Sequence, residues 1–135
     1  MPEDPNAPAP DSPWKQTTLF STLARRTAYS LDGIRAAWRD EEAFRSTCKL
    51  FFVFFPLALW CGHDWQERAI LALPCFLSPM VELINSAIEN AIDRVSLERH
   101  PLAKKAKDMG SAAQLLCQML YLFVWANWAL AMIAD

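Results

Sequence analysis

Three long apolar segments dominate the hydrophobic pattern of the chain. They cover residues 44–61, 69–92 and 111–134, and each is close to the ~20 residues that a helix needs to cross a hydrocarbon layer of ~30 Å. The link between the first two, residues 62–65, is so short that these two segments are expected to form an antiparallel hairpin. The third segment contains no charged side chain. The pattern predicts three transmembrane helices.

A fourth helical pattern precedes the first apolar segment, over about residues 19–39. Apolar side chains such as Leu23, Leu31 and Ile34 recur there at helical spacing, and the charged side chains fall largely elsewhere. Such a helix lies in the membrane surface rather than crossing it. A soluble amphipathic helix has the same pattern, but the later segments leave little soluble core to pack against. We therefore predict an all-α membrane protein with an N-terminal amphipathic surface helix plus three transmembrane helices.

The beginning of the chain differs in composition from the rest. Residues 1–13 contain five of the nine prolines and almost no side chain that could build a core. Residues 1–18 are therefore expected to form a disordered tail. The remaining residues, 19–135, are expected to form a single membrane domain, because the chain has only 135 residues and 53% of them are hydrophobic.

The placement of lysine and arginine predicts the orientation of the spans. Seven of these residues precede or begin the first span, and five lie between Arg94 and Lys107. Only Arg68 lies near the link between the first two spans. The positive-inside rule then places the N-terminus and the segment 93–108, expected to be a loop, in the cytoplasm. The C-terminus is expected outside.

Composition and motifs exclude several classes of function. The net charge of -2 gives no argument for a nucleic-acid partner. His63 and His100 are far apart in sequence, and the cysteines form no CxxC pair, so a zinc site is not indicated. No GxxxxGK[ST] run occurs, which excludes the P-loop kinases. The cysteines, expected to be reduced thiols, are Cys48, Cys61, Cys75 and Cys117.

Three polar side chains interrupt the second span at regular spacing, a fourth follows directly after it, and the four form what we call the polar stripe. Glu82, Asn85, Glu89 and Asp93 follow at offsets of 3, 7 and 11 residues, which places them on one helix face over roughly 16 Å. Carboxylates inside a bilayer are costly unless they face a protein interior or a wet cavity. The stripe alone leaves three interpretations open: hydrogen bonds between helices, a proton or cation path through an oligomer, or enzyme chemistry.

The same span contains two prolines, Pro74 and Pro79, shortly before the polar stripe. Proline cannot donate the backbone hydrogen bond of a helix and its ring crowds the preceding turn. The sequence therefore predicts a bend of the second span just before Glu82.

Charged residues gather at the end of the spans where the polar stripe emerges. Lysines follow the second span in the run from His100 to Asp108, and the acidic run 40–42 begins the first span. A basic segment at a membrane surface is most often a topology signal or a lipid headgroup contact. Acidic residues at two helix ends with lysines nearby would also suit a metal-bound polyphosphate.

Two runs of residues resemble signature segments of the prokaryotic diacylglycerol kinases. The first is Val81–Glu89 (VELINSAIE), followed by Asp93 and Arg94, and the second is Ala106–Ala113 (AKDMGSAA). Residues 33–38 and 41–45 are similar to the surface helix and to the beginning of the first span in that family. The resemblance covers about residues 19–134.

The resemblance implies an enzyme that uses ATP to phosphorylate 1,2-diacylglycerol to phosphatidic acid in the bacterial inner membrane, with Mg²⁺ as cofactor. It also implies a homotrimer whose active sites are shared between neighbouring subunits. The nearest alternative is an undecaprenol kinase of the same superfamily. An alternative of another class is a non-catalytic oligomeric channel or assembly protein that uses the polar stripe for cation passage or helix pairing.

By position, the resemblance also assigns roles to residues. Glu82 would be the general base that accepts the proton of the lipid hydroxyl, and Glu41 and Glu89 would hold the divalent metal. The residues expected to contact the lipid substrate are Asn85, Ser111, Arg35 and Trp38. The residues expected to contact the nucleotide are Tyr29, Glu41, Glu89, Glu98, Arg99, His100, Lys107 and Asp108.

Overall fold

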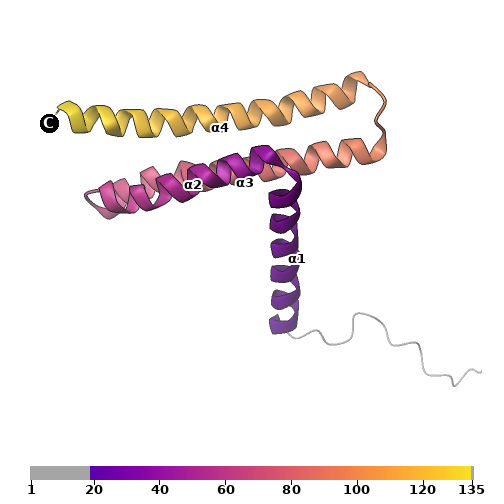
Figure 1. Cartoon of the computed structure of the whole chain (residues 1–135), viewed down its shortest axis with the longest axis horizontal. Helices are drawn as coiled ribbons and strands as arrows, with labels where there is room; N and C mark the ends of the chain where they lie inside the picture. Colours follow the sequence, from indigo (N-terminus) through magenta and orange to yellow (C-terminus); the bar gives the residue numbers. More distant parts are fainter. Residues whose placement is uncertain (1–18, 135) are drawn as a thin grey trace, which may run out of the picture. The chain divides into compact units, whose positions relative to one another are not determined.

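A computed structural model describes residues 19–134 of the chain. The predicted disordered tail, residues 1–18, lies outside the described residues. Within the described range the chain is helical and contains no strand (Figure 1). The helices are α1 (Leu19–Asp40), α2 (Glu42–Cys61), α3 (Trp65–Val95) and α4 (Pro101–Ala134). The all-α prediction, with one helix ahead of three helices formed by the apolar segments, is confirmed.

Three of these helices, α2, α3 and α4, are long and apolar enough to cross a membrane. Helix α3 has 31 residues and α4 has 34, which correspond to lengths of about 46 Å and 51 Å at 1.5 Å per residue. Both exceed a hydrocarbon layer of ~30 Å. Each predicted span lies inside one of these helices, and α3 and α4 extend well beyond the apolar segments.

The connection between α3 and α4 corrects one expectation from the sequence. Residues 93–108 were expected to be a loop, but only residues 96–100 lie between the two helices. The lysines at 104, 105 and 107 are therefore on α4. Proline is well suited to the first position of a helix, where Pro101 lies, and Ala and Lys have high helix propensity. These charged residues lie outside the apolar segment 111–134, but the helix α4 includes them.

The turn between α2 and α3 is closed by local hydrogen bonds. The Asp64 side chain caps α3 by accepting from the backbone N–H of Glu67 at 2.8 Å. The Glu67 carboxylate in turn accepts from the backbone N–H of His63 at 2.8 Å. Arg68 Nε donates to the carbonyl of Gly62 at 2.9 Å. These bonds use the backbone groups that the ends of two helices leave free, and the predicted hairpin is confirmed.

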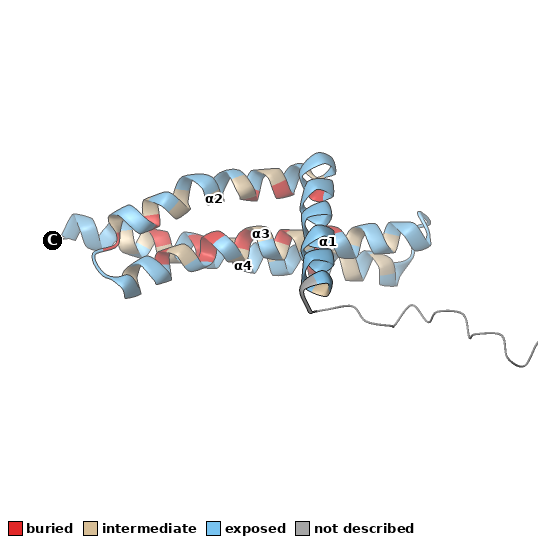
Figure 2. Ribbon diagram, turned by 90° about the horizontal axis from the view of Figure 1, so that it is seen from below, coloured by how far each residue is buried: buried red, intermediate tan, exposed pale blue. Residues whose placement is uncertain are grey.

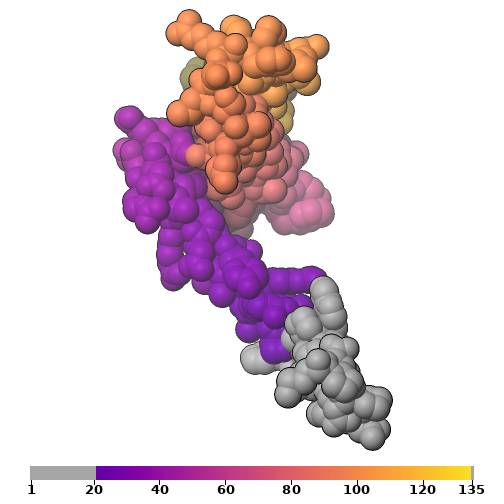
Figure 3. Space-filling view, turned by 90° about the vertical axis from the view of Figure 1, so that its right-hand side faces the viewer, coloured from indigo at the N-terminus to yellow at the C-terminus, as the bar shows by residue number. Residues whose placement is uncertain are grey.

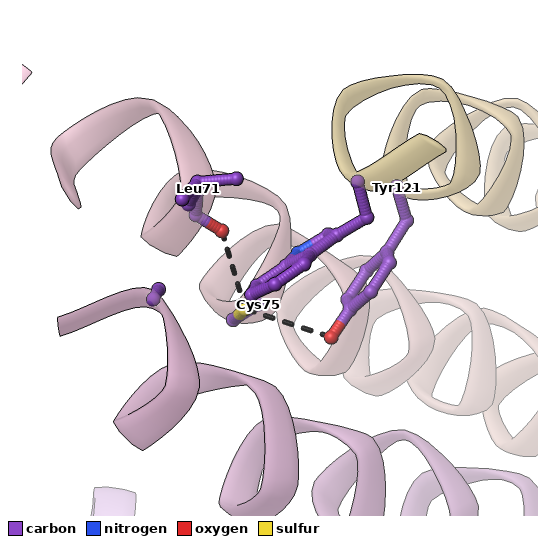
Figure 4. Packing of buried hydrophobic residues seen from close by; sticks show 5 residues of the cluster. Leu71, Cys75 and Tyr121 are labelled. Atoms are coloured by element: carbon purple, nitrogen blue, oxygen red, sulfur yellow. Dashed lines mark hydrogen bonds between the residues drawn. The ribbon is translucent and has the colours of Figure 1, made fainter. Parts of the chain in front are cut away.

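The apolar core lies between α2, α3 and α4, in the half of the bundle that contains this turn. Helix α3 contacts both of the others. Cys75 of α3 lies between Leu71 of the same helix and Tyr121 of α4 (Figure 4). Its Sγ donates to the carbonyl oxygen of Leu71 at 3.4 Å and lies 3.5 Å from the hydroxyl oxygen of Tyr121. All four cysteines are free thiols, as expected. The buried members of this core cluster are Ala58, Leu71, Cys75, Tyr121 and Trp125.

Aromatic rings complete the core cluster from the side of α2. Phe54 packs edge to face against Tyr121 and Trp125, with ring centroids 5.6 Å and 4.8 Å apart. Few residues of the helices are buried, and most are exposed (Figure 2). Many of those exposed side chains are large and apolar. A single chain with such a surface is suited to lipid or to contact with other membrane-embedded helices.

The described residues up to Arg35 and those from Ala36 onward form two compact units. In the first unit, α1 is a regular helix with an ion pair between Arg35 and Asp32 at 2.9 Å. Its predicted position in the membrane surface stays a prediction. In the second unit, α3 continues as one helix through Pro74 and Pro79. The expected bend before Glu82 also stays a prediction.

Candidate active site

The polar stripe of α3 passes from the interior of the bundle to its surface. Glu82 is only 5% exposed and Asn85 only 9% exposed. Glu89 is half-buried and Asp93 is exposed. Exposure to solvent therefore increases along the polar stripe, and Glu82 is its most deeply buried carboxylate. Carboxylates inside a bilayer are costly, and those that occur there usually mark function, so Glu82 is a candidate catalytic group.

Asn85 connects the stripe to α4. Its Nδ2 donates to Glu89 Oε1 at 3.0 Å, one turn further along α3. Its Oδ1 is buried without a hydrogen-bond partner among the described residues and faces Gly110 of α4. A Cβ at Gly110 would lie 2.2 Å from this oxygen, much closer than two non-bonded atoms can approach. Glycine at 110 thus allows α4 to approach Asn85 closely.

Glu41 lies where α1 ends and α2 begins. It occupies the N-cap position of α2, yet its side chain makes no capping hydrogen bond. Its Oε1 instead accepts a hydrogen bond of 2.9 Å from Nδ2 of Asn90 on α3. Asn90 directly follows Glu89 in the sequence. This contact therefore brings Glu41 into the neighbourhood of the polar stripe, which contains the other two carboxylates predicted to carry the chemistry.

This neighbourhood fits a magnesium ion bound together with a nucleotide. Among the described residues, no group of three or more His, Cys, Asp or Glu side chains is arranged to hold a metal. Mg²⁺ on a nucleotide needs only one or two carboxylates, because phosphates and water supply the other ligands. Glu41 and Glu89 are each oriented by an asparagine amide of α3. Two such carboxylates are a suitable donor set.

The neighbouring Asp40 is engaged elsewhere. Its two oxygens accept from Nε and Nη2 of Arg39, both at 2.8 Å. These side-chain hydrogen bonds hold the pKa of Asp40 below its ordinary value. Asp40 thus forms a surface pair with Arg39, which leaves Glu41 as the carboxylate of this corner that contacts α3.

A cleft of about 600 Å³ lies where α3 ends and α4 begins; Figure 3 looks onto this end, with the start of α4 in orange. Its size is in the range of small-molecule sites. The Lys107 ammonium contacts Asp93 at 2.6 Å across the cleft. The cleft is lined by Ile92, Asp93, Ser96, Leu97, Glu98, Arg99, His100, Pro101, Ala103, Lys104, Lys107 and Asp108.

The chain is similar over most of its length to known bacterial proteins. The family model of the prokaryotic diacylglycerol kinases matches residues 28–128. A diacylglycerol kinase of Pseudomonas aeruginosa is 48% identical over 116 residues, which are 86% of this chain and 94% of the relative. One from Helicobacter pylori is 47% identical over 113 residues, 84% of this chain and 88% of the relative. One from Escherichia coli K12 is 38% identical over 109 residues, 81% and 89% of the two chains.

The chain belongs to the prokaryotic diacylglycerol kinase family. The resemblance inferred from the two signature runs is thereby confirmed. Membership of this family, together with three helices able to cross a membrane, makes the chain a multi-pass membrane protein. The matched region, residues 28–128, contains every residue for which the resemblance implied a role in binding or catalysis.

The structure brings some of these residues together within the second unit. Five of the predicted nucleotide contacts line one cleft, namely Glu98, Arg99, His100, Lys107 and Asp108. Ser111 is exposed on α4, directly after Gly110. Trp38 is partly exposed, and its carbonyl accepts from Arg45 Nη1 at 3.0 Å. Tyr29 and Arg35 lie on α1 in the first unit, where both are exposed. The roles of all these residues stay predictions.

Two residues of the site had no role in the sequence-based prediction. Asn90 follows Glu89 directly, but nothing in the local pattern indicates that it contacts Glu41, which is 49 residues away. Gly110 belongs to a run that resembles the family, yet its spacing does not indicate contact with Asn85. A polar residue just beside the polar stripe and a glycine in an otherwise regular helix were the available signals.

Proposed function

We propose that the protein transfers the γ-phosphoryl group of ATP to the primary hydroxyl of 1,2-diacylglycerol, giving phosphatidic acid and ADP. Membership of the diacylglycerol kinase family supports the lipid substrate. The observation that carries the site is the polar stripe of α3. It leads from Glu82, buried within a helix able to span a membrane, towards a cleft lined by cationic side chains. One end suits a lipid hydroxyl and the other suits polyphosphate.

In this proposal Glu82 is the general base. The lipid hydroxyl oxygen attacks the γ-phosphorus, the bond between that phosphorus and the bridging oxygen of ADP breaks, and the hydroxyl proton passes to the Glu82 carboxylate. Burial of Glu82 supports this assignment because few water molecules can compete for it. Asn85 lies beside Glu82 on the same face and, with Ser111, Arg35 and Trp38, is assigned to the lipid headgroup.

Glu41 and Glu89 are assigned to the divalent metal of the nucleotide. A bound Mg²⁺ would neutralise charge on the phosphates during transfer. The orientation of both carboxylates by α3 amides supports this assignment. Glu41 and Glu89 are also nearer to the surface than Glu82.

The cleft between α3 and α4 is assigned to the phosphates and the rest of the nucleotide. Arg99 and Lys107 would neutralise phosphate charge without a glycine-rich loop, and His100 would contact the nucleotide beside them. Lys107 is now paired with Asp93, and in the complex its ammonium would transfer from that carboxylate to a phosphate oxygen. Glu98 and Asp108 would contact the nucleotide through hydrogen bonds, and Tyr29 of α1 is assigned to the nucleotide as well.

We further infer that the enzyme is a homotrimer in the bacterial inner membrane, with active sites shared between subunits. The large exposed apolar surface of α2, α3 and α4 supports burial against lipid and neighbouring subunits. The beginning of α2 and the connection between α3 and α4 lie at the same end of the hairpin arrangement. Most positive charges lie at this end, which supports its assignment to the cytoplasm, with the N-terminus there and the C-terminus outside.

The deciding experiment uses purified protein in mixed micelles with γ-labelled ATP and either diacylglycerol or undecaprenol. We expect label in phosphatidic acid, dependent on added Mg²⁺ and abolished by a chelator. Label in undecaprenyl phosphate alone would transfer the proposal to the polyprenol kinases of the superfamily. Label in neither lipid, from protein that is folded and of one oligomeric size, would refute the kinase proposal.

A further inference from the structure

Asn90 of α3 carries a side-chain amide that no predicted role uses. Its Nδ2 donates to the backbone carbonyl of Ser86 at 2.8 Å, one turn earlier on the same helix, and to Glu41 Oε1 at 2.9 Å. A primary amide has two donor hydrogens, and both are used here. The reversed amide would place Oδ1 against two acceptors. Only the observed orientation therefore makes both contacts attractive.

The backbone around Glu41 is held independently of Asn90. The Glu41 N–H donates to the carbonyl of Ala37 at 2.9 Å, and the Glu41 carbonyl accepts from the N–H of Arg45 at 3.2 Å. Arg45 Nη1 also donates to the carbonyls of Trp38 and Arg39. The corner between α1 and α2 is thus fixed by its own hydrogen bonds.

The Glu41 carboxylate, in contrast, depends on Asn90. Glu41 has an extended backbone, with φ −111° and ψ 110°, and its side chain does not cap its own helix. Among the described residues, the hydrogen bond to its carboxylate comes from Asn90 alone. A glutamate side chain with no such bond would sample several rotamers. Asn90 therefore selects the direction in which this carboxylate points.

We infer that Asn90 is a positioning residue that holds Glu41 for the divalent metal. The inference rests on the proposed function, in which Glu41 and Glu89 are metal ligands. Asn90 contacts Oε1, which leaves Oε2 of Glu41 available as a ligand. Mg²⁺ requires nearly ideal octahedral geometry, and groups that orient a ligand commonly affect affinity strongly. Asn85 makes the corresponding contact to Glu89, so α3 orients both carboxylates.

The test measures Mn²⁺ binding by electron paramagnetic resonance, in micelles with a non-hydrolysable ATP analogue. Asn90→Leu keeps the approximate size of the side chain and removes the donor, whereas Asn90→Gln keeps a donor. Asn127→Leu is the matched control, because Asn127 makes the same bond to a carbonyl one turn earlier, that of Phe123 at 2.7 Å, on another helix. The Mg²⁺ concentration for half-maximal phosphoryl transfer is measured in parallel.

We expect Asn90→Leu to weaken Mn²⁺ binding by about 3- to 10-fold, the factor supplied by one hydrogen bond of ordinary net strength. The half-maximal Mg²⁺ concentration should rise by the same factor, while kcat at saturating Mg²⁺ changes by less than about 2-fold. Asn90→Gln should recover part of the affinity, and Asn127→Leu should bind Mn²⁺ as the wild type does.

Unchanged Mn²⁺ affinity in Asn90→Leu would overturn the inference, and so would unchanged affinity in Glu41→Gln. A loss of kcat without any change in metal affinity would also overturn it, because it would indicate a general structural role. Weakened Mn²⁺ binding by Asn90→Leu in a protein that makes no phosphatidic acid would support the inference about Asn90 while refuting the proposed function.

Discussion

The two halves of the α3–α4 pair use different means to hold the same two helices together. In the half near the α2–α3 turn, which we call the apolar half, the contact consists of aromatic rings and a thiol, from Tyr121, Trp125 and Cys75. In the other half, which we call the polar half, α4 approaches Asn85 through Gly110, and the carboxylate of Glu82 is buried nearby. Apolar contacts tolerate small shifts, whereas hydrogen bonds and charges depend on direction. Stability and chemistry are thus separated along one pair of helices.

The largest expected effect is on turnover and follows from removing the carboxylate of the polar half. Removal of a carboxylate in the apolar half is the control. Glu82→Gln keeps the size of the side chain and removes the base, so we expect turnover to fall by ~10²- to 10⁴-fold. Glu67→Gln, near the other end of α3, removes the charge of a carboxylate that contacts the ring and the backbone N–H of His63. Its turnover should stay within about 2-fold of the wild type.

Both variants are to be measured by phosphatidic acid formation at saturating ATP, lipid and Mg²⁺, after their oligomeric size and helix content have been checked. Retention of more than a tenth of wild-type turnover in Glu82→Gln would remove Glu82 from the role of base. An equal loss in Glu67→Gln would mean that the two halves are not functionally separate.

The next largest effect should be on stability and should arise in the apolar half. Trp125 is buried among Phe54, Tyr121 and Trp128. Its replacement by alanine leaves a large cavity, which we expect to lower the free energy of unfolding in micelles by about 3 kcal/mol. This value is at the low end for tryptophan because lipid or detergent replaces water around the helices. Trp60, which is 84% exposed, is the control, and Trp60→Ala should cost much less.

Both changes are measured by reversible unfolding in mixed micelles. Unfolding is monitored by the circular dichroism of the helical backbone, because the variants differ in tryptophan content. The remaining folded fraction of Trp125→Ala should phosphorylate diacylglycerol at a nearly normal rate per folded molecule. A specific loss of kcat in that fraction would show that the aromatic core also shapes the site and would contradict the separation of the halves.

The apolar half is the part of the fold that the sequence predicts best. Long apolar segments identify the three spanning helices, and the spacing of Glu82, Asn85 and Glu89 predicts their common face. Helix ends were less predictable, since Lys104 and Lys105 extend α4 beyond the apolar segment while a hydropathy pattern ends there.

Contacts in the polar half were less predictable because they depend on how helices approach one another. Asn90 and Glu41 are 49 residues apart, and their hydrogen bond requires both the corner before α2 and the antiparallel return of α3. The pairing of Lys107 with Asp93 likewise depends on the short connection of residues 96–100. The local pattern of residues in the sequence predicts neither of these two contacts. The family resemblance supplied the roles of such residues but not their partners.

A smaller effect should follow from adding one methyl group where α4 approaches Asn85. In Gly110→Ala the new Cβ would lie 2.2 Å from Asn85 Oδ1, so the amide or the helix must move. We expect a loss of about 1–3 kcal/mol in the free energy of unfolding. Turnover should fall as well, because Asn85 orients Glu89.

Gly33→Ala is the matched control for this change. Gly33 lies within α1, where an added Cβ would meet no atom within 4 Å. Alanine has the higher helix propensity, so this variant should gain about 0.5–1 kcal/mol if α1 folds and unfolds with the rest. Thermal unfolding and Mg²⁺ titration of activity measure the pair. Equal stability and equal Mg²⁺ dependence of Gly110→Ala and wild type would mean that Asn85 does not depend on this close approach.

The smallest effect should occur where the two halves meet, at the hydrogen bond from Gln118 Nε2 to Ser78 Oγ, 2.8 Å long. Ser78 is fully buried and links α3 to α4 between the core cluster and Glu82. A double-mutant cycle with Ser78→Ala and Gln118→Leu isolates this bond from the packing of each side chain. Measured couplings of this kind within membranes average only ~0.6 kcal/mol.

We expect a coupling of about that size in the free energy of unfolding and a change in turnover of less than about 2-fold. The expectation is small because the unfolded helices in a micelle find other partners for the same groups. A coupling above about 2 kcal/mol, or a loss of turnover comparable to that of Gly110→Ala, would place Ser78 and Gln118 within the polar half. The part of α3 that affects turnover would then begin near Ser78, between Cys75 and Glu82, rather than at Glu82.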